Sequence, residues 1–253
     1  MAARVSGAGV RVGVDQRKVY THVAKSCPSP RHTVERQLDV VRRIGIFPGA
    51  GERELFWEIP EAARGAMRSR VGWERFILVH PASRWRFKCW PEERMRELAR
   101  RLVARGEKLV FTSGPDRVER EMVDRIVEGL DGVCNLAGQI SLKELGALIE
   151  RAAALVCVDS VPLHMASALK RPVVALFGPS SEVTWGPWQN PRARIVTEAM
   201  SCRPCYLDGC GGSKRSDCLA AVSVERVLSE LEFLSEVGAS GLRIIHELVD
   251  CPR

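Results

Sequence analysis

Polar side chains in two segments of this chain are of the types that bind phosphate and sugar groups. The segments are HPASRWRFKCWPEE at residues 80–93, which contains Lys88, and VDSVPLHMASALKRPVVALFGPSS at residues 158–181, which contains Asp159. In each segment polar residues follow an apolar, strand-like stretch and stand where a helix begins. In a doubly wound α/β domain, ligands bind at the carboxyl ends of the strands, where helix N-termini offer unpaired N–H groups. The two segments therefore predict a site for a nucleotide sugar.

Neither of the two common glycine-rich phosphate loops occurs in the sequence. No G-x-G-x-x-G follows the first strand of the regular region, and no G-x-x-x-x-G-K-[ST] is present. A phosphate site must then use Ser83, Arg84 and Lys88, together with the backbone from Ser160 to Leu163 at the start of a later helix. On spacing alone, Lys88 fits a solvated loop lysine equally well, so both interpretations stay open.

Asp159 and His164 also admit two interpretations each. Asp159 ends the stretch ALVCVD, where a carboxylate can accept hydrogen bonds from ribose hydroxyls or from helix N–H groups. The alternative for Asp159 is a plain helix cap. His164 lies one turn into the predicted helix, where a histidine that only packs against the core would also fit. The combination of residues favours a binding site more than any single member does.

From residue 72 onward, apolar strands alternate regularly with amphipathic helices. Gly106 marks the end of one helix, and Ser141 opens another, with Glu144 placed to complete a capping box. The expected strands are 76–80, 108–113, 133–138, 154–159 and 172–178, and the expected helices are 91–105, 118–130, one from 141 and one near 162. This alternation predicts a parallel sheet covered by helices on both faces.

Residues 1–71 lack this alternation. RVGVD at 11–15 predicts a short strand, residues 32–46 predict a helix, and the turn formers in 47–64 are typical of a linker. One strand and one helix cannot enclose a core. We therefore expect residues 1–71 to be the C-terminal remnant of a first domain plus a linker, residues 72–240 to form one complete domain, and residues 241–253 to form a tail.

The composition indicates a packed protein outside the membrane. Of the 253 residues, 45% are hydrophobic and 27% are charged, which favours a globular core over disorder. No apolar run approaches the roughly 18 residues that span a bilayer. The first 25 residues lack the continuous apolar stretch of a signal peptide. A cytoplasmic location is expected.

The net charge of +7 favours an anionic partner. Nucleic acid, an acidic membrane surface and a phosphorylated small molecule all carry the required charge. Nucleic acid fits least well, because the arginines are spread over helix faces and no nucleic-acid motif is present. The sequence therefore predicts no nucleic-acid partner and leaves the other two classes open.

Four of the nine cysteines form a cysteine box with the pattern C-x2-C-x4-C-x7-C, consisting of Cys202, Cys205, Cys210 and Cys218. This spacing is compatible with zinc or an iron–sulfur cluster. Disulfides are disfavoured in a reducing cytosol. The remaining cysteines fit ordinary buried or loop thiols: Cys27, Cys89, Cys134, Cys157 and Cys251.

Together these motifs resemble the ADP-heptose:lipopolysaccharide heptosyltransferases of glycosyltransferase family 9. In their C-terminal domain, members carry a strand ending in His, a Lys-x-Trp followed by Pro-Glu, an Asp-(Thr/Ser)-x-x-x-His element, an Arg-Pro and a Gly-Pro turn. The segments SRWRFKCW and CRPCYLDGCGGSKRSDCL are most similar to the heptosyltransferase III branch, and the similarity covers residues 15–236. The matching positions are His80, Lys88, Trp90, Pro91, Glu92, Asp159, Ser160, His164, Arg171, Pro172, Gly178 and Pro179.

The resemblance implies a GT-B architecture, in which two Rossmann-like domains face a cleft and the C-terminal one holds the donor. It implies an inverting transfer of heptose from ADP-heptose, without metal or other cofactor, in which Lys88 stabilises charge on the departing diphosphate. By the same resemblance, Glu119 loosely matches an acidic position after the second strand. The implied donor contacts are Ser83, Arg84 and Lys88 near the diphosphate and sugar, Ile140 near the adenine, and Asp159, Ser160, Val161 and His164 around the ribose and pyrophosphate.

The resemblance also implies an acceptor, the lipid A–core oligosaccharide, met at the inner face of the inner membrane through peripheral contact. The resemblance further implies that a Gly-Asp loop after the opening strand of the N-terminal domain supplies the acceptor contacts and the catalytic carboxylate, and residues 1–71 contain no match to it. We therefore expect the general base to be absent from this chain, which resembles an N-terminally truncated member. Because the family does not require its cysteine boxes for transfer, no metal is expected there. The alternative function is a non-catalytic donor-binding remnant or a metal-stabilised interaction module.

Overall fold

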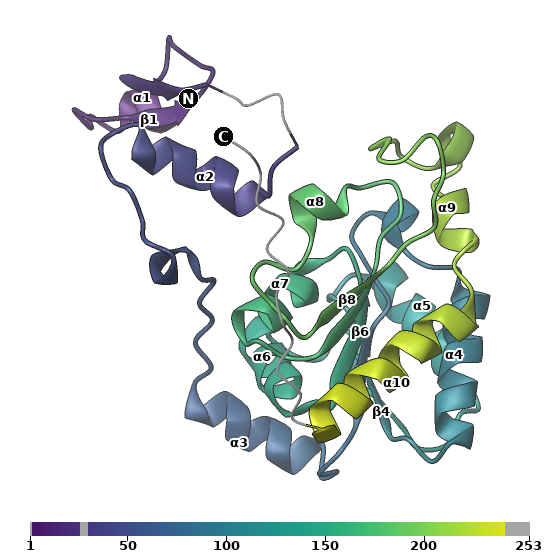
Figure 1. Cartoon of the computed structure of the whole chain (residues 1–253). Helices are drawn as coiled ribbons and strands as arrows, with labels where there is room; N and C mark the ends of the chain where they lie inside the picture. The colour runs from purple at the N-terminus through teal and green to yellow at the C-terminus, as the bar shows by residue number, and fades with distance from the viewer. Residues whose placement is uncertain (1, 26–29, 241–253) are drawn as a thin grey trace.

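The computed structural model describes residues 2–25 and 30–240. Cys27 and the expected tail at 241–253, which contains Cys251, lie outside the described residues. Figure 1 shows a larger sheet enclosed by helices and a smaller part with one main helix, joined by a long connection. The larger sheet has six strands and the smaller one has two.

All strand pairs of the larger sheet are parallel, in the order β5-β4-β3-β6-β7-β8. The chain proceeds outward from β3 to β5, crosses back to β6 beside β3, and proceeds outward again to β8. The order thus reverses between β3 and β6, which is the switch point of a doubly wound fold. The predicted α/β class with a parallel sheet is confirmed. The strands are β3 (Ile77–His80), β4 (Leu109–Phe111), β5 (Val133–Asn135), β6 (Ala154–Val158), β7 (Val173–Leu176) and β8 (Ala193–Val196).

Helices cover both faces of this sheet, and each face has its own hydrophobic core cluster. The helices α4 (Glu92–Ala104), α5 (Arg117–Val127) and α10 (Val224–Ser240) contribute to one cluster. The helices α3 (Glu61–Arg70), α6 (Leu142–Arg151) and α7 (Val161–Ala168) contribute to the other. The strands β3, β6 and β7 are buried along their whole length, as expected when both faces of a parallel sheet are covered.

Local signals in the sequence set several helix ends. Ser141 Oγ accepts from Glu144 N at 3.3 Å while Glu144 Oε2 accepts from Ser141 N at 2.7 Å, so the predicted capping box at the start of α6 is confirmed. Asp116 caps α5 by accepting from Val118 N at 2.8 Å. The chain leaves α4 through Gly106, whose φ of +83° is a left-handed conformation that glycine adopts without steric cost.

The predictions for the N-terminal part need correction. The helix expected at 32–46 is α2 (Thr33–Arg42), which ends before Ile44, and a second strand, β2 (His22–Ala24), pairs in parallel with β1 (Val12–Val14). Residues 47–64 are not an unstructured linker, because they contain the 3-10 helix η1 (Gly51–Arg53) and the start of α3. Only two of the ten residues of α3 are buried. Too few apolar residues recur at helical spacing in this segment for the sequence to predict a helix. Further elements that the sequence did not indicate are β8, α10, and the short helices α1 (Ala2–Val5), α8 (Glu182–Trp185) and α9 (Asp217–Ala220).

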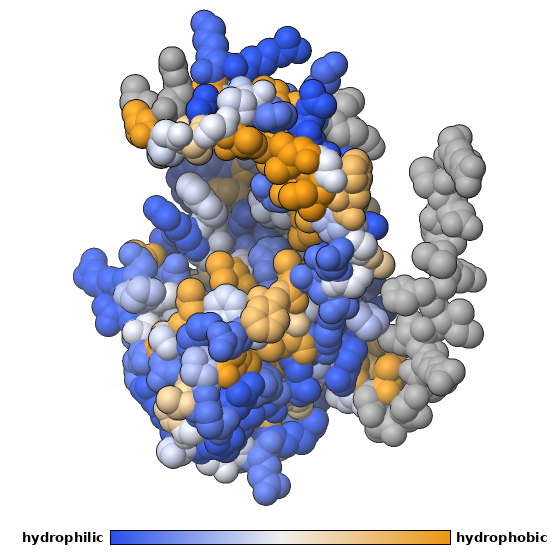
Figure 2. Space-filling model, turned by 90° about the vertical axis from the view of Figure 1, so that its left-hand side faces the viewer, coloured by the Kyte–Doolittle hydropathy of each residue, from blue (hydrophilic) through white to orange (hydrophobic). Residues whose placement is uncertain are grey.

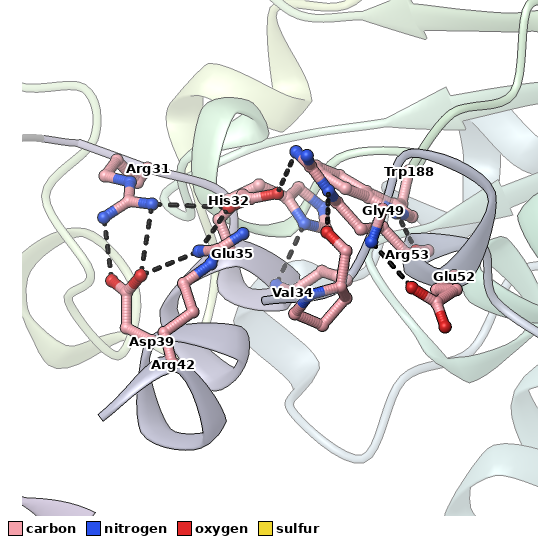
Figure 3. A network of polar contacts seen from close by, with 11 residues as sticks. Arg31, His32, Val34, Glu35, Asp39, Arg42, Gly49, Glu52, Arg53 and Trp188 are labelled. Atoms are coloured by element: carbon pink, nitrogen blue, oxygen red, sulfur yellow. Dashed lines mark hydrogen bonds and ion pairs between the residues drawn. The ribbon is translucent and has the colours of Figure 1, made fainter. Parts of the chain in front are cut away.

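The smaller part meets the larger one through His32 (Figure 3). His32 Nδ1 accepts from Val34 N at 3.1 Å as the N-cap of α2, so Nε2 carries the proton and donates to Gly186 O at 2.9 Å. The imidazole stacks on Trp188 with ring centroids 4.6 Å apart, and Trp188 Nε1 donates to Arg53 O at 2.7 Å. Burial lowers the pKa of His32, against the opposing effects of Gly186 and Glu35. A neutral imidazole therefore holds α2 against the larger domain.

The surface is hollowed between the two parts, and hydrophobic side chains gather beside the hollow on each of them (Figure 2). The exposed hydrophobic residues of the smaller part and the connection include Ile44, Ile46, Phe47 and Phe56. None of the helices in residues 2–25 and 30–240 combines the length and the apolar character that crossing a bilayer requires.

Candidate functional site

The switch point brings the two predicted segments together. Lys88 comes from the loop after β3 and Asp159 directly follows β6, and Lys88 Nζ donates to Asp159 Oδ2 at 2.7 Å. The side chain of Lys88 is only 20% exposed and that of Asp159 only 6%. The solvated-lysine interpretation of Lys88 is therefore wrong. A half-buried cation and a buried anion are thus paired where ligands of doubly wound domains bind.

The loop after β3 is held in place by buried anchors on both sides of Lys88. Pro81 and Ala82 are buried where the strand ends, and the 3-10 helix η2 (Arg86–Lys88) precedes Trp90. Trp90 is almost fully buried, and its Nε1 donates to Val222 O at 3.2 Å, which ties the loop to the segment before α10. These anchors hold the backbone that carries Lys88 over the end of β6.

Asp159 has a second partner, Ser180, which is not among the residues predicted from the sequence. Ser180 Oγ, only 3% exposed as a residue, donates to Asp159 Oδ2 at 2.6 Å. Ser160, not Asp159, occupies the N-cap position of α7. The Ser160 hydroxyl makes no capping hydrogen bond to the helix and donates instead to Val158 O at 3.2 Å. The carboxylate of Asp159 therefore bonds Lys88 and Ser180, and its interpretation as a plain helix cap is wrong.

The remaining predicted residues on α7 lie beside this pair. Val161 is exposed at the first turn, and His164 is half-buried one turn later. Burial lowers the pKa of His164; nearby Asp159 opposes this, whereas His32 and Lys88 add to it. His164 therefore stays neutral near pH 7. It lies close enough to interact electrostatically with His32 of the smaller part and with Asp159 and Lys88 of the larger domain. At the N-terminus of α7, Pro162 has no N–H and Leu163 N donates to Ser160 O at 3.1 Å. This end therefore offers an anion the N–H of Val161 and the positive end of the helix dipole.

His80 has a structural position under the site. It ends β3, is 7% exposed, and its Nδ1 lies 2.9 Å from Thr112 Oγ1. Burial lowers the pKa of His80 to about 4. A neutral ring bonded to Thr112 links β3 to the chain after β4.

The other predicted donor contacts occupy the same edge of the sheet without bonding the Lys88–Asp159 pair. Ser83 is half-buried; its N donates to Cys89 Sγ at 3.3 Å and its Oγ accepts from Trp85 N at 3.3 Å. Arg84 is exposed, and Ile140 is half-buried in the loop between β5 and α6. Burial raises the pKa of the Cys89 thiol to about 11, so this sulfur is neutral and unreactive near pH 7.

Glu119 shapes the neighbouring loop after β4. Its Oε2 accepts from Gly114 N at 2.9 Å. A Cβ at Gly114 would lie 2.8 Å from the same carboxylate oxygen, so a larger residue there would displace the end of the Glu119 side chain. In this structure the carboxylate serves the backbone of its own loop.

The segment that contains the cysteine box packs beside the site. Tyr206 N donates to Pro179 O at 2.9 Å, and Ser216 Oγ donates to Phe87 O at 2.7 Å, next to Lys88. Cys202 and Cys210 are exposed, Cys205 is half-buried and Cys218 is buried. Among the residues that the structure describes, no three His, Cys, Asp or Glu side chains converge to hold a metal ion. The metal-free interpretation stays a prediction.

A cavity of about 330 Å³ lies at the base of the same segment. Its lining does not include the predicted donor-binding residues, although Arg203 connects it to the turn that carries Ser180: Arg203 Nε donates to Gly178 O at 2.6 Å. The cavity is therefore a neighbour of the site rather than the site itself. It is lined by Glu182, Ala199, Met200, Ser201, Arg203 and Pro204.

Sequence reasoning missed Ser180, Arg203 and His32. Ser180 had a usable signal, because it comes shortly after β7, and Asp159 comes directly after β6. The two strands are neighbours, and the carboxyl ends of adjacent parallel strands meet at one edge of the sheet. Arg203 and His32 had none, since their partners are backbone carbonyls distant in the sequence.

Comparison with known proteins agrees with this geometry. The family model for glycosyltransferase family 9 (heptosyltransferase) matches residues 1–214. Lipopolysaccharide heptosyltransferase 3 of Escherichia coli is 32% identical over 186 residues, which are 69% of this chain and 52% of that protein. The chain thus spans about half the length of this relative and of its counterpart in E. coli strain K12.

Two solved structures share the fold. The E. coli ADP-heptose LPS heptosyltransferase II has a TM-score of 0.76 at 23% identity, covering 93% of this chain and 72% of that one. The family 9 glycosyl transferase of Veillonella parvula DSM 2008 has a TM-score of 0.75 at 26% identity, covering 91% of this chain and 68% of that one. The match of the family model over most of the sequence, in agreement with the parallel sheet and the Lys88–Asp159 pair at its switch point, shows that this chain belongs to glycosyltransferase family 9, the heptosyltransferase family.

Proposed function

We propose that this chain binds ADP-heptose at the β3–β6 switch point and takes part in inverting transfer of heptose to the lipopolysaccharide inner core. The observation that carries the proposal is the Lys88–Asp159–Ser180 cluster beside the N-terminus of α7, in which Asp159 and Ser180 are buried and Lys88 is half-buried. The cluster and the N-terminus of α7 offer positive charge for a diphosphate, and Asp159 offers a carboxylate for hydroxyls. Its family relatives include lipopolysaccharide heptosyltransferases, and one solved relative is named for ADP-heptose.

In the proposed reaction, an acceptor hydroxyl oxygen attacks the anomeric carbon of heptose from the face opposite the ADP. The bond from that carbon to the diphosphate oxygen breaks, the electron pair leaves with ADP, and the hydroxyl proton passes to a base. In this proposal, charge on the departing diphosphate develops beside Lys88 and the N-terminus of α7, and such preplaced positive charge lowers the barrier. Asp159 is not assigned as the base, because its carboxylate is already bonded to Lys88 and Ser180.

The proposed donor contacts are those predicted from the sequence. Ser83, Arg84 and Lys88 would contact the diphosphate and sugar, Ile140 the adenine, and Asp159, Ser160, Val161 and His164 the ribose and pyrophosphate. We propose residues 72–240 as the donor domain and residues 1–71 as part of the acceptor side. α3 covers the donor domain, because Arg64 forms a double hydrogen bond with Glu150 of α6 at 2.7 and 2.9 Å.

The proposed acceptor, the lipid A–core oligosaccharide, is a membrane lipid, which implies peripheral contact at the cytoplasmic face of the inner membrane. The net charge of +7 and the exposed Arg84, Trp85 and Arg86 support this part of the proposal. Basic side chains attract anionic lipid, and tryptophan favours the membrane interface. Cosedimentation with anionic vesicles, but not with purely zwitterionic ones, is the expected result.

Calorimetric titration of the purified chain tests donor binding directly. ADP and ADP-heptose should bind at one site per chain, and UDP should bind more weakly. Absence of ADP binding would reject the proposal. The second candidate function, donor binding without catalysis, is separated by a turnover assay with ADP-heptose and a heptose-bearing core acceptor: binding with turnover identifies a transferase, and binding without turnover identifies the donor-binding module.

A further inference from the structure

We propose that Ser180 is a positioning residue that keeps the Asp159 carboxylate hydrogen-bonded when Lys88 turns from it to the donor diphosphate. This inference rests on the proposed function and extends it to a residue outside the predicted donor contacts. In this proposal Lys88 has two alternative partners. It donates to Asp159 when no donor is bound and to the diphosphate when the donor is bound.

The geometry shows a single carboxylate oxygen shared by two donors. Asp159 Oδ2 accepts from Lys88 Nζ at 2.7 Å and from Ser180 Oγ at 2.6 Å. The two donors differ in their freedom to move. Lys88 is a long side chain that retains 20% exposure, whereas Ser180 is short and almost fully buried. Lys88 can therefore reorient toward a ligand, while Ser180 stays with the carboxylate.

The buried environment makes this shared bond matter for ligand binding. Removing one partner from a buried charged group costs far more than an exposed pair is worth, because the charge is left without compensation. If Lys88 moved to a diphosphate and no other donor faced Asp159, that cost would oppose binding. The hydroxyl of Ser180 reduces this cost, because the carboxylate then keeps one hydrogen-bond donor.

The turn that carries Ser180 is fixed by contacts from the neighbouring segment. Arg203 is the main anchor: its side chain is 8% exposed, its Nε donates to Gly178 O at 2.6 Å, and its Nη2 lies 3.1 Å from Glu182 Oε2. A Cβ at Gly178 would lie 2.6 Å from Leu219, so the turn backbone packs tightly on that residue. The hydroxyl of Ser180 is thus presented to Asp159 by a rigid turn.

The next residue provides a matched control. Ser181 is also buried, but its hydroxyl accepts from Thr184 N at 3.3 Å as the cap of α8. Ser180→Ala and Ser181→Ala remove the same atom from adjacent positions of one turn. Only the first removes a bond to Asp159.

The experiment is a calorimetric double-mutant cycle with ADP as the ligand, using wild type, Ser180→Ala, Lys88→Ala, the double variant and Ser181→Ala. Ser180→Ala should weaken ADP binding about tenfold, the lower part of the range for an unpaired buried acceptor. In the Lys88→Ala background the same change should alter affinity by about twofold or less, because no cation then leaves Asp159 on binding. Ser181→Ala should bind ADP within about twofold of wild type.

Three outcomes would overturn this inference while the proposed function still holds. Wild-type affinity in Ser180→Ala would show that the hydroxyl is not needed, and an equal loss with and without Lys88 would show a purely structural role. An equal loss in Ser181→Ala would assign the effect to the turn as a whole. If wild type itself fails to bind ADP, the proposed function falls and this inference falls with it. Melting temperatures of all variants identify any that fail to fold, and Ser180→Cys then replaces Ser180→Ala as a nearly isosteric variant with a weak donor.

Discussion

Lys88 and Asp159 stand 71 residues apart in the sequence, and Lys88 Nζ lies 2.7 Å from Asp159 Oδ2. They meet because β3 and β6 are neighbours in the sheet although β4 and β5 separate them along the chain. The crossover thus places a cation from one loop against an anion from another at the switch point. Ser180 joins them because β7 is the next strand along. This pair and its third partner are the basis of the function proposed above.

Lys88→Ala should weaken ADP binding by roughly 1.5 to 3 kcal/mol, the range for a hydrogen bond to a charged group. The physical reason is the loss of the ammonium group that donates to Asp159 and is proposed to contact the diphosphate. Lys108→Ala is the matched control, since Lys108 is exposed at the start of β4, at the opposite edge of the sheet. Calorimetric titration measures both variants. Unchanged affinity in Lys88→Ala would sink the donor-site assignment.

His80 should make the folded state sensitive to acid. Its pKa is about 4 in the folded protein, against 6.5 as the ordinary value, so the unfolded chain binds the proton first as the pH falls. Its stabilising contribution is therefore complete above pH 6.5 and declines as the pH falls toward 4, by about 3 kcal/mol in total. Burial of His32 and His164 acts in the same direction.

Urea unfolding of wild type and His80→Gln between pH 7 and pH 4 measures this contribution. The variant should start less stable at pH 7 and lose less stability on acidification, while His22→Gln at an incompletely buried site should behave as wild type. Parallel pH profiles for wild type and His80→Gln would contradict the assignment.

Trp188→Ala should loosen the junction between the two parts of the chain. The substitution removes the stack on His32 and the hydrogen bond to Arg53 O. An aromatic pair contributes about 0.5 to 1.5 kcal/mol beyond its buried area. The fraction of molecules in which the two parts are separated at this junction should therefore rise by roughly threefold or more. Trypsin cleavage after Arg43 and Arg53 should accelerate by a similar factor. Trp85→Ala, which removes an exposed tryptophan from a different loop, should leave the cleavage rate unchanged.

The cysteine box should contain no stoichiometric metal. Its segment is already held by Arg203, Tyr206 and Ser216, which bond to Gly178 O, Pro179 O and Phe87 O. Elemental analysis of protein purified without chelator should find well below one zinc or iron per chain, and chelator should leave the melting temperature unchanged. A stoichiometric metal whose removal unfolds the protein would show instead that the site contributes folding free energy, as structural metal sites do.

Several elements could be predicted from the sequence because their signals are local. The capping box of Ser141 and Glu144 and the stop at Gly106 involve residues close together in the chain, so they act before any tertiary contact forms. The apolar runs of β3, β6 and β7 indicated a parallel sheet covered on both faces. The strand-end rule then placed Lys88 and Asp159 at one edge without knowledge of their contact.

What the sequence by itself determined is thus the alternation of strands and helices and the type of residue at each strand end. Tertiary structure decided which of those residues touch. Asp159 has Ser180 as a partner only because β7 pairs with β6, and α3 is a helix because Ala63 and Met67 pack against the sheet's helical layer rather than because its own pattern is strong. The physical reason is that capping and periodicity depend on neighbours along the chain, whereas strand order is set by the burial of whole faces, which no short stretch of sequence encodes.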